Sequence, residues 1–408
     1  MYVIIGGSAA AISCIAGIRS IDTATPITLI TEETDTNYAR PMISYWLCGK
    51  TTAENMHFRA PSFYADNGVT VLCGNKAEAI DAKNKTVTLN TGKHIAYSKL
   101  LLATGSRPFV PPVEGLESVS QMFTFMTLES ANALAAALQP ESRVLIVGAG
   151  LTGLKCAEGI HGRCGKITVV DFAPRILPAV LDAKAAAMVQ THMEKAGIAF
   201  RLSTGVASFE KDVAKLQTGE GIPFDILVMA VGVRPNTQLL ADIGGAVNKG
   251  IIINAQCQTS LPDIYAAGDC AEGTDVQTAA GRILPLWPVA MAEGRCAGIN
   301  MAGGTADNTD NVAVNATGLF GLHMITAGVY DGEDYIEQSQ GSYKRLITKD
   351  GVLRGMIMLG DVARAGIYTN LIRTAEPLAD IDFELIKKAP QLMAFSRSQR
   401  AQQLGGEV

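Results

Sequence analysis

The sequence lacks several patterns that mark metal, redox-dithiol and nucleic-acid-binding proteins. Eight cysteines occur in 408 residues, but no two form a Cys-x-x-Cys or Cys-x4-Cys pair. The usual zinc spacings, iron–sulfur runs and local redox dithiols are therefore missing, and we expect no metal site. The formal net charge is −5, without a basic block, which argues against nucleic acid as a partner.

Long apolar runs are also missing. No uncharged apolar run reaches the length of a membrane span, and no charged-then-apolar leader precedes the first expected strand. We therefore expect a soluble, cytoplasmic protein without a membrane span. A hydrophobic content of 48% with 18% charged residues is typical of a globular chain with a large core, and the length suggests two or three domains.

The chain opens with the pattern of a strand, a tight turn and a helix. Apolar residues 3–5 stop at Gly6, and small residues lead into a helical pattern over 12–18. A helix N-terminus with unpaired N–H groups suits a pyrophosphate. Against the fingerprint Gly-x-Gly-x-x-Gly/Ala, the turn has Ser8 in place of the second glycine. We expect pyrophosphate binding here by Gly6, Gly7, Ser8, Ala9 and Ala10.

Charged candidates follow the second expected strand, 27–30. Glu32 comes 26 residues after Gly6, where a ribose hydroxyl needs an acceptor, and Glu33 is its neighbour. Arg40 can present planar donors to a phosphate. The alternative for Arg40 is an ion pair with Glu32 or Glu33.

A complete second fingerprint follows a helical stretch over 128–138. Strand 144–147 leads into Gly-Ala-Gly-Leu-Thr-Gly, and the next strand, 167–170, ends at Asp171, 23 residues after Gly148. At this spacing a carboxylate accepts from a ribose 2′-OH and repels a 2′-phosphate, which favours NADH over NADPH. The expected NAD-binding residues are Gly148, Gly150, Leu151, Thr152, Gly153 and Asp171.

Other expected strands also end in small residues or a carboxylate. Strand 99–102 runs into Ala103-Thr104-Gly105, a strand near 226–230 runs into Val231-Gly232, and a strand near 264–267 runs into Gly268-Asp269. Open α/β sheets bind cofactors at such carboxyl ends. Two dinucleotide units in one chain imply a flavin and a nicotinamide that exchange a hydride.

Taken in order, these motifs resemble the pyridine-nucleotide–disulfide oxidoreductase superfamily. The similarity covers nearly the whole chain and is greatest to NADH:rubredoxin reductases, the flavin module of nitrite reductases and NADH oxidases. The motifs are Gly6–Ala11, Glu32, Tyr38-x-Arg40-Pro41, Ala103–Gly105, Gly148–Gly153, Ala230–Pro235 and Ala266–Asp269.

The resemblance implies an α/β fold with two Rossmann-like dinucleotide-binding domains, as in glutathione reductase, plus a small α+β C-terminal domain. It implies FAD and NAD as cofactors. The expected domains are an FAD domain at 1–115 and 245–315, an NAD domain at 116–244, and a C-terminal interface domain with a tail at 316–408.

The resemblance also assigns roles to residues. Asp269 would hold the ribityl chain of FAD, Glu32 and Arg40 its ADP half, and the helix after Trp287 the flavin pyrimidine edge. Further candidate cofactor-binding residues are Glu33, Ala77, Ala103, Thr104, Gly105, Arg107, Val231, Gly232, Gly268, Leu286 and Trp287.

Two positions depart from this resemblance. Many members carry a Glu in the helix after the NAD fingerprint, paired with a Lys near the flavin N5, but the corresponding residues here are Lys155 and Tyr45. We expect Lys155 to donate near the flavin N5 or the nicotinamide carboxamide, with Tyr45 as a neighbour. The alternative is that Lys155 folds away to Glu158 or solvent.

Cys48 has two interpretations. Ser44-x-x-x-Cys48-Gly49 resembles the redox-cysteine segment of NADH oxidases and coenzyme A-disulfide reductases, in which the thiolate cycles through a sulfenate or mixed disulfide. The same segment also resembles rubredoxin reductases, which often have Ala there, so a small thiol packed under the flavin is the alternative.

These observations favour an FAD flavoprotein that transfers electrons between NAD(H) and a protein electron carrier: rubredoxin, ferredoxin or an iron–sulfur partner subunit. One alternative is a Cys48-dependent NADH oxidase, peroxidase or coenzyme A-disulfide reductase. Another is an NADH-sensing flavoprotein that acts as a binding module. A homodimer is possible, and the tail with Lys387, Lys388, Arg397 and Arg400 is either a docking arm or a solvated amphipathic end.

Overall fold

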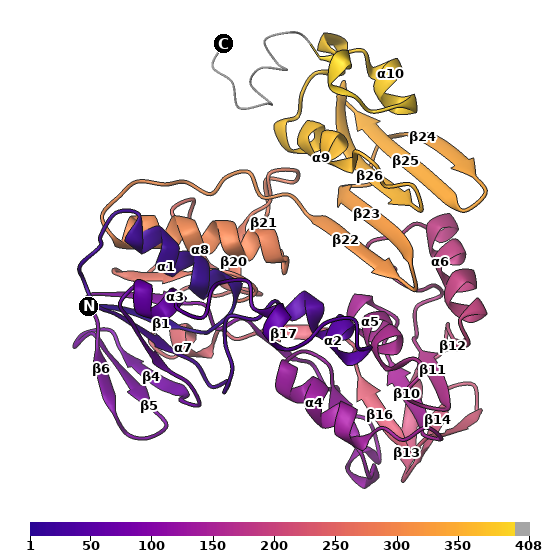
Figure 1. Cartoon of the computed structure of the whole chain (residues 1–408), viewed down its shortest axis with the longest axis horizontal. Helices are drawn as coiled ribbons and strands as arrows, with labels where there is room; N and C mark the ends of the chain where they lie inside the picture. Colours follow the sequence, from indigo (N-terminus) through magenta and orange to yellow (C-terminus); the bar gives the residue numbers. More distant parts are fainter. Residues whose placement is uncertain (396–408) are drawn as a thin grey trace. The chain divides into compact units, whose positions relative to one another are not determined.

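A computed structural model describes residues 1–395, which fall into two compact units (Figure 1). The first unit comprises Met1–Leu177, Glu194–Thr274 and Gly281–Thr309. The second comprises Pro178–Met193, Asp275–Ala280 and the described residues from Asp310 to Phe395. Each unit is described by itself below.

The first unit contains a five-stranded parallel sheet with the order β19-β7-β1-β2-β3. Ile5 lies opposite both Ile30 and Leu102, so the central strands end together at one edge. The strands read as nearly continuous apolar runs because helices and loops cover both faces of a parallel sheet. Their bounds are β1 (Tyr2–Ile5), β2 (Ile27–Ile30), β3 (Val69–Leu72), β7 (Lys99–Leu102) and β19 (Ile264–Ala266).

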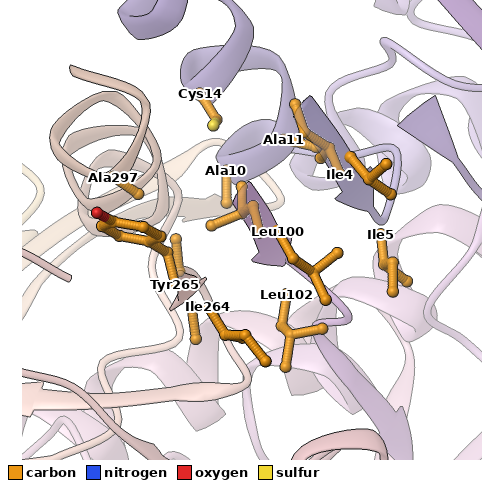
Figure 2. Packing of buried hydrophobic residues seen from close by; sticks show 14 of the residues in the cluster. Ile4, Ile5, Ala10, Ala11, Cys14, Leu100, Leu102, Ile264, Tyr265 and Ala297 are labelled. Carbon is orange, nitrogen blue, oxygen red and sulfur yellow. The ribbon is translucent and has the colours of Figure 1, made fainter. Parts of the chain in front are cut away.

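Helices α1 (Ala9–Arg19) and α8 (Trp287–Met301) pack closely beside this sheet. Figure 2 shows side chains of β1, β7 and β19 gathered near Ala10 of α1 and Ala297 of α8. Glycines permit the close approach of the two helices. A Cβ on Gly294 would lie 2.1 Å from the Ala10 carbonyl oxygen, and one on Gly298 would lie 2.2 Å from that of Cys14.

Smaller elements border the first sheet. An antiparallel sheet contains β4 (Ala77–Asp81), β5 (Thr86–Leu89) and β6 (His94–Ala96). A second small sheet contains β18 (Ile251–Ile252), β20 (Ala271–Thr274) and β21 (Gly281–Arg282). The short helices nearby are α2 (Ile43–Leu47), α3 (Phe63–Asp66) and α7 (Gln238–Ala241).

A second parallel sheet in the first unit has the order β12-β11-β10-β16-β9. Its strands are β9 (Met122–Thr124), β10 (Arg143–Val147), β11 (Lys166–Val170), β12 (Ile198–Arg201) and β16 (Ile226–Met229). The associated helices are α4 (Leu128–Ala137) and α5 (Leu151–Ile160). Helix α6 (Ala183–Lys195) follows in the chain, and its residues up to Met193 belong to the second unit. An antiparallel sheet of β13 (Val206–Glu210), β14 (Val213–Leu216) and β15 (Gly221–Pro223) accompanies them.

Two short strands join the parts of the first unit that carry the parallel sheets. Strand β8 (Ser106–Pro108) pairs antiparallel with β17 (Val233–Pro235), and Arg107 lies opposite Arg234. The chain therefore leaves the first sheet and returns to it along one two-stranded ribbon.

The second unit contains a five-stranded antiparallel sheet with the order β22-β23-β26-β25-β24, covered by α9 (Ala365–Thr374) and α10 (Phe383–Lys388). The turn at residues 349–351 joins β25 to β26, and Asp350 and Gly351 both have positive φ, as such tight hairpins require. Lys387 and Lys388 end α10, whereas Arg397 and Arg400 lie outside the described residues. The strands are β22 (Val314–Leu319), β23 (Leu322–Gly328), β24 (Glu333–Ser339), β25 (Ser342–Lys349) and β26 (Val352–Leu359).

Within residues 1–395, no helix combines the length and apolar character needed to cross a membrane.

The α1–α8 contact gives a first prediction. Gly298→Ala places a methyl group against the Cys14 carbonyl oxygen and should destabilise the fold by about 1–3 kcal/mol, the usual cost of overpacking. Gly366→Ala in α9 is the control, because a Cβ there meets no atom within 4 Å. Differential scanning calorimetry should show a lower Tm for Gly298→Ala alone. Equal Tm values for the two variants would contradict the proposed packing constraint.

Candidate functional site

The first turn, Gly6–Ala10, lies between the end of β1 and the start of α1. The Gly6 N–H donates to the Ile30 carbonyl oxygen at 2.8 Å. Gly6 has φ +122°, and a Cβ on it would lie 2.1 Å from the Ala103 carbonyl oxygen, so the backbone of this turn requires glycine. Ser8 occupies the N-cap position without a side-chain capping bond, so its hydroxyl leaves the helix N–H groups available.

Arg40 lies beside this turn. Its Nε donates to Ser8 Oγ at 3.3 Å, and one terminal nitrogen donates to the Met126 carbonyl oxygen at 3.3 Å. The other terminal nitrogen forms an ion pair with Glu33, which also accepts a 2.5 Å hydrogen bond from the Tyr38 hydroxyl. The ion-pair alternative for Arg40 thus occurs, with Glu33 as the partner, and it places the guanidinium next to Ser8.

Glu32 lies between the buried Thr31 and Glu33, and its side chain is exposed. Ala77, in contrast to the exposed Glu32, is buried at the start of β4 within the core around the first sheet. Trp287, the first residue of α8, is half-buried and contacts Phe58 edge-on, with ring centroids 4.8 Å apart, while Leu286 is the N-cap of that helix.

Asp269 follows the end of β19, at the same sheet edge as the first turn. Burial raises the pKa of its carboxyl group, while the nearby Arg40 and a 3.4 Å hydrogen bond from Ser106 Oγ oppose that rise. Gly268 has φ +79°, and its N–H donates to Glu293 Oε2 at 2.8 Å. The sequence motifs assign no role to Glu293, which is a carboxyl residue within the largely small and apolar sequence of α8.

The segment after β7 is linked to the segment after β17. Thr104 Oγ1 donates to the Asn236 carbonyl oxygen at 2.7 Å, and the Asn236 side-chain amide donates back to the Thr104 carbonyl oxygen at 2.8 Å. Arg107 donates to the Asn236 side-chain oxygen at 2.9 Å. Asn236 is a second residue that the motifs did not identify. Gly105 has φ +61° and open space where a Cβ would lie.

The second turn, Gly148–Gly153, repeats the geometry of the first. Gly148 has φ +117°, and a Cβ on it would lie 2.3 Å from the Ala230 carbonyl oxygen. A Cβ on Gly153 would lie 2.0 Å from the Gly148 carbonyl oxygen. By contrast, Gly150 and Gly232 both have open space at that place. Two positions whose backbone requires glycine are thus combined with two glycines beside open space, an arrangement that fits a dinucleotide pyrophosphate.

Asp171 supports the second turn directly. One carboxylate oxygen accepts from the Ala149 N–H at 2.6 Å, and the other accepts from the Ala173 N–H at 2.8 Å. An ionised carboxylate has about four acceptor positions, so Asp171 retains the capacity to accept from a ribose hydroxyl. Leu151 and Thr152 begin α5 on the helical side of the turn, and Val231 precedes the open Gly232 after β16.

Lys155 and Tyr45 come together as expected. Lys155 Nζ lies 4.4 Å from the Tyr45 ring centroid, within the range of a cation–π contact. The same ammonium group forms an ion pair with the buried carboxylate of Glu158. Lys50 approaches Glu158 from outside, with its Nζ 3.8 Å from Oε1. The expected neighbour and the alternative partner of Lys155 therefore both occur in one cluster.

Cys48 lies at the C-terminal end of α2. It is half-buried, and its Sγ donates to the Tyr45 carbonyl oxygen at 3.4 Å. All eight cysteines are free, and Cys270 beside Asp269 is buried. The redox role of Cys48 stays a prediction.

Two Rossmann-type turns, each at the carboxyl edge of a parallel sheet, define a class of oxidoreductases that bind two dinucleotides. The chain belongs to the pyridine nucleotide-disulphide oxidoreductase family, whose pattern matches residues 1–294. The predicted superfamily and fold class are confirmed. The chain is an FAD-dependent oxidoreductase that uses NAD(H).

Curated relatives match most of this chain. The epsilon subunit of NADH-dependent phenylglyoxylate dehydrogenase from Aromatoleum evansii is 30% identical over 91% of both chains. Rubredoxin-NAD(+) reductase from Alcanivorax borkumensis is 29% identical over 90% of this chain and 97% of its own. The chain spans only 48% of the nitrite reductase [NAD(P)H] of Bacillus subtilis, with 28% identity over 93% of this chain.

A solved structure gives the same fold. The covalent putidaredoxin reductase–putidaredoxin complex contains a chain that matches this one with a TM-score of 0.88 and 24% identity, over 100% of this chain and 99% of that chain.

The second turn gives a prediction about NADH binding. Gly150→Ala adds a methyl group in open space, so folding and FAD content should not change. The methyl group would keep the NADH pyrophosphate away from the backbone, so we expect KM for NADH to rise on the order of tenfold, equivalent to about 1.4 kcal/mol. Steady-state kinetics measure this, with Gly366→Ala as the unaffected control. An unchanged KM in Gly150→Ala would contradict pyrophosphate binding at this turn.

Proposed function

We propose that this chain transfers electrons between NAD(H) and a protein electron carrier: rubredoxin, ferredoxin or an iron–sulfur partner subunit. The observation that carries the proposal is the match over 91% of both chains to a named subunit of an NADH-dependent dehydrogenase. The similarity to a rubredoxin-NAD(+) reductase over 97% of that relative's length supports the same reaction type.

The first turn and its surroundings would hold FAD. The N–H groups at Ser8, Ala9 and Ala10 would face the pyrophosphate, together with the Arg40 guanidinium, which the Glu33 ion pair already orients. Glu32 would accept from the adenosine ribose, and Asp269 would accept from a ribityl hydroxyl. Bound FAD supplies the chemistry, because it accepts a hydride with two electrons and releases the electrons singly.

The second turn would hold NAD(H). Gly148, Gly150 and Gly153 would receive the pyrophosphate, and Asp171 would accept from the adenosine ribose. The carboxylate of Asp171 is already oriented by the Ala149 N–H, so it would repel a 2′-phosphate from a fixed position. We therefore propose NADH rather than NADPH as the cosubstrate.

Lys155 and Tyr45 would orient the nicotinamide. The Lys155 side chain is 14% exposed and is held between the Tyr45 ring and the Glu158 carboxylate, so its charge has a defined place. From this place the ammonium group would donate to the nicotinamide carboxamide or near the flavin N5.

A second candidate function is a Cys48-dependent NADH oxidase. An NADH oxidase from Methanocaldococcus jannaschii is 33% identical over 74% of this chain, which favours this alternative. The peroxidase, the coenzyme A-disulfide reductase and the NADH-sensing binding module are less favoured. We also propose the domain boundaries given above and a cytoplasmic location. A further proposal is a homodimer formed through 316–408, which light scattering of the purified chain would detect.

Titration with NADH distinguishes electron transfer to a carrier from Cys48 chemistry. We expect anaerobic NADH to bleach the flavin without a long-wavelength thiolate–flavin charge-transfer band. Cys48→Ser should then turn over with purified rubredoxin or [2Fe–2S] ferredoxin at the wild-type rate. A charge-transfer band that disappears in Cys48→Ser, together with rapid oxygen consumption by the wild type, would favour the oxidase instead.

The Lys155 cluster gives a further prediction. Lys155→Met removes a desolvated cation–π contact worth up to about 2 kcal/mol and the donor to the carboxamide, so flavin reduction by NADH should slow on the order of tenfold. Lys50→Met is the matched control, since it removes an outer, 56% exposed lysine from the same carboxylate. Stopped-flow absorbance measures both variants. Equal reduction rates in wild type and Lys155→Met would rule out this role.

A further inference from the structure

Glu293 is a buried carboxyl residue for which the sequence motifs assign no role. Its side chain lies on α8 and is 4% exposed. Its Oε2 accepts the Gly268 N–H at 2.8 Å, and its Oε1 would lie 3.5 Å from a Cβ on Gly273. The backbone of Gly268 has a left-handed conformation, with φ +79°, and Asp269 follows directly. The Glu293 carboxyl group therefore fixes the Ala267–Gly268 peptide, one residue before the proposed ribityl-binding residue Asp269.

The titratable groups around Glu293 include one carboxyl group and several thiols. Asp269 and Cys270 face it from the segment after β19, Cys257 from the segment before β19, and Cys296 from its own helix. The cation at Arg40 acts on Asp269. Burial, with Asp269 adding to the effect, raises the pKa of Glu293 to about 8. At neutral pH this carboxyl group is therefore mostly protonated.

We propose that Glu293 is a positioning residue for FAD, whose neutral carboxyl group holds the Gly268–Asp269 turn in its receptive conformation. The ionised form would place a second negative charge beside Asp269, in a poorly solvated region where like charges repel strongly. FAD adds the negative charge of its pyrophosphate near the same sheet edge. FAD retention should therefore weaken in mild alkali. This inference rests on the proposed role of Asp269.

The test measures FAD binding by the apoprotein across pH, using quenching of FAD fluorescence. The wild-type Kd should rise by up to about tenfold per pH unit above the Glu293 pKa, because one proton is linked to binding. Glu293→Gln should show no such rise, because its amide oxygen still accepts the Gly268 N–H but cannot ionise. Glu293→Ala should bind FAD weakly at every pH.

Glu272→Gln is the matched control. Glu272 is also buried and accepts a backbone N–H, that of Gly250 at 2.9 Å, but it holds a different loop. Its pH profile should match the wild type. An equal pH dependence in wild type and Glu293→Gln would overturn the inference. Failure to bind FAD at any pH would instead overturn the proposed FAD site.

The stability of the apoprotein gives a second readout. The pKa of Glu293 is raised in the folded state, so its stabilising effect is complete below the ordinary value of 4.5 and is lost as pH rises through about 8. The Tm of the wild type should therefore fall relative to that of Glu293→Gln over this interval. Parallel Tm profiles for the two proteins would overturn the inference independently of FAD.

Discussion

The structure depends on one steric constraint that occurs twice. A carbonyl oxygen from a neighbouring strand occupies the place where a Cβ would lie, Ala103 against Gly6 and Ala230 against Gly148. The glycine N–H in each case donates to the last residue of the next strand, Ile30 or Val170. Three strands are thereby brought to a common edge, and a helix N-terminus faces outward from that edge. A larger side chain at either glycine would separate the strands that form the site.

Much of this arrangement follows from local sequence. Apolar β-branched runs that end in glycine predict both turns, and a Lys-Asp-Gly tripeptide between apolar runs predicts the hairpin of β25 and β26. Local patterns cannot supply the pairing of residues that are distant in the chain. The bonds of Glu293 to Gly268 and of Asn236 to Thr104 arise only when separate strands and helices pack. Sequence motifs identify the candidate ligand-binding residues, whereas the residues that hold those motifs in place are brought to them only by the assembled fold.

The Lys155 cluster shows how one ammonium group contacts an aromatic ring and a carboxylate at once. An ammonium group can contact an aromatic face on one side and a carboxylate on another, so Tyr45 and Glu158 do not compete for Lys155. In the family pattern that the sequence resembles, a Glu at the position of Lys155 pairs with a Lys at the position of Tyr45. Here the lysine stands on α5 itself, with its carboxylate three residues further along the helix. The positive charge between α2 and α5 therefore comes from α5.

The ribbon of β8 and β17 has a consequence for how the chain can be rearranged. Its two strands run side by side in opposite directions, and Arg107 lies opposite Arg234. The chain segment between β8 and β17 is thus connected to the first sheet through this one pair of strands. The corresponding segment of a relative could therefore replace the segment between β8 and β17, or a short linker could join the two strands. Neither change alters the order of the strands in the first sheet. This connection makes the segment between β8 and β17 exchangeable by recombination, while the first parallel sheet keeps its own core.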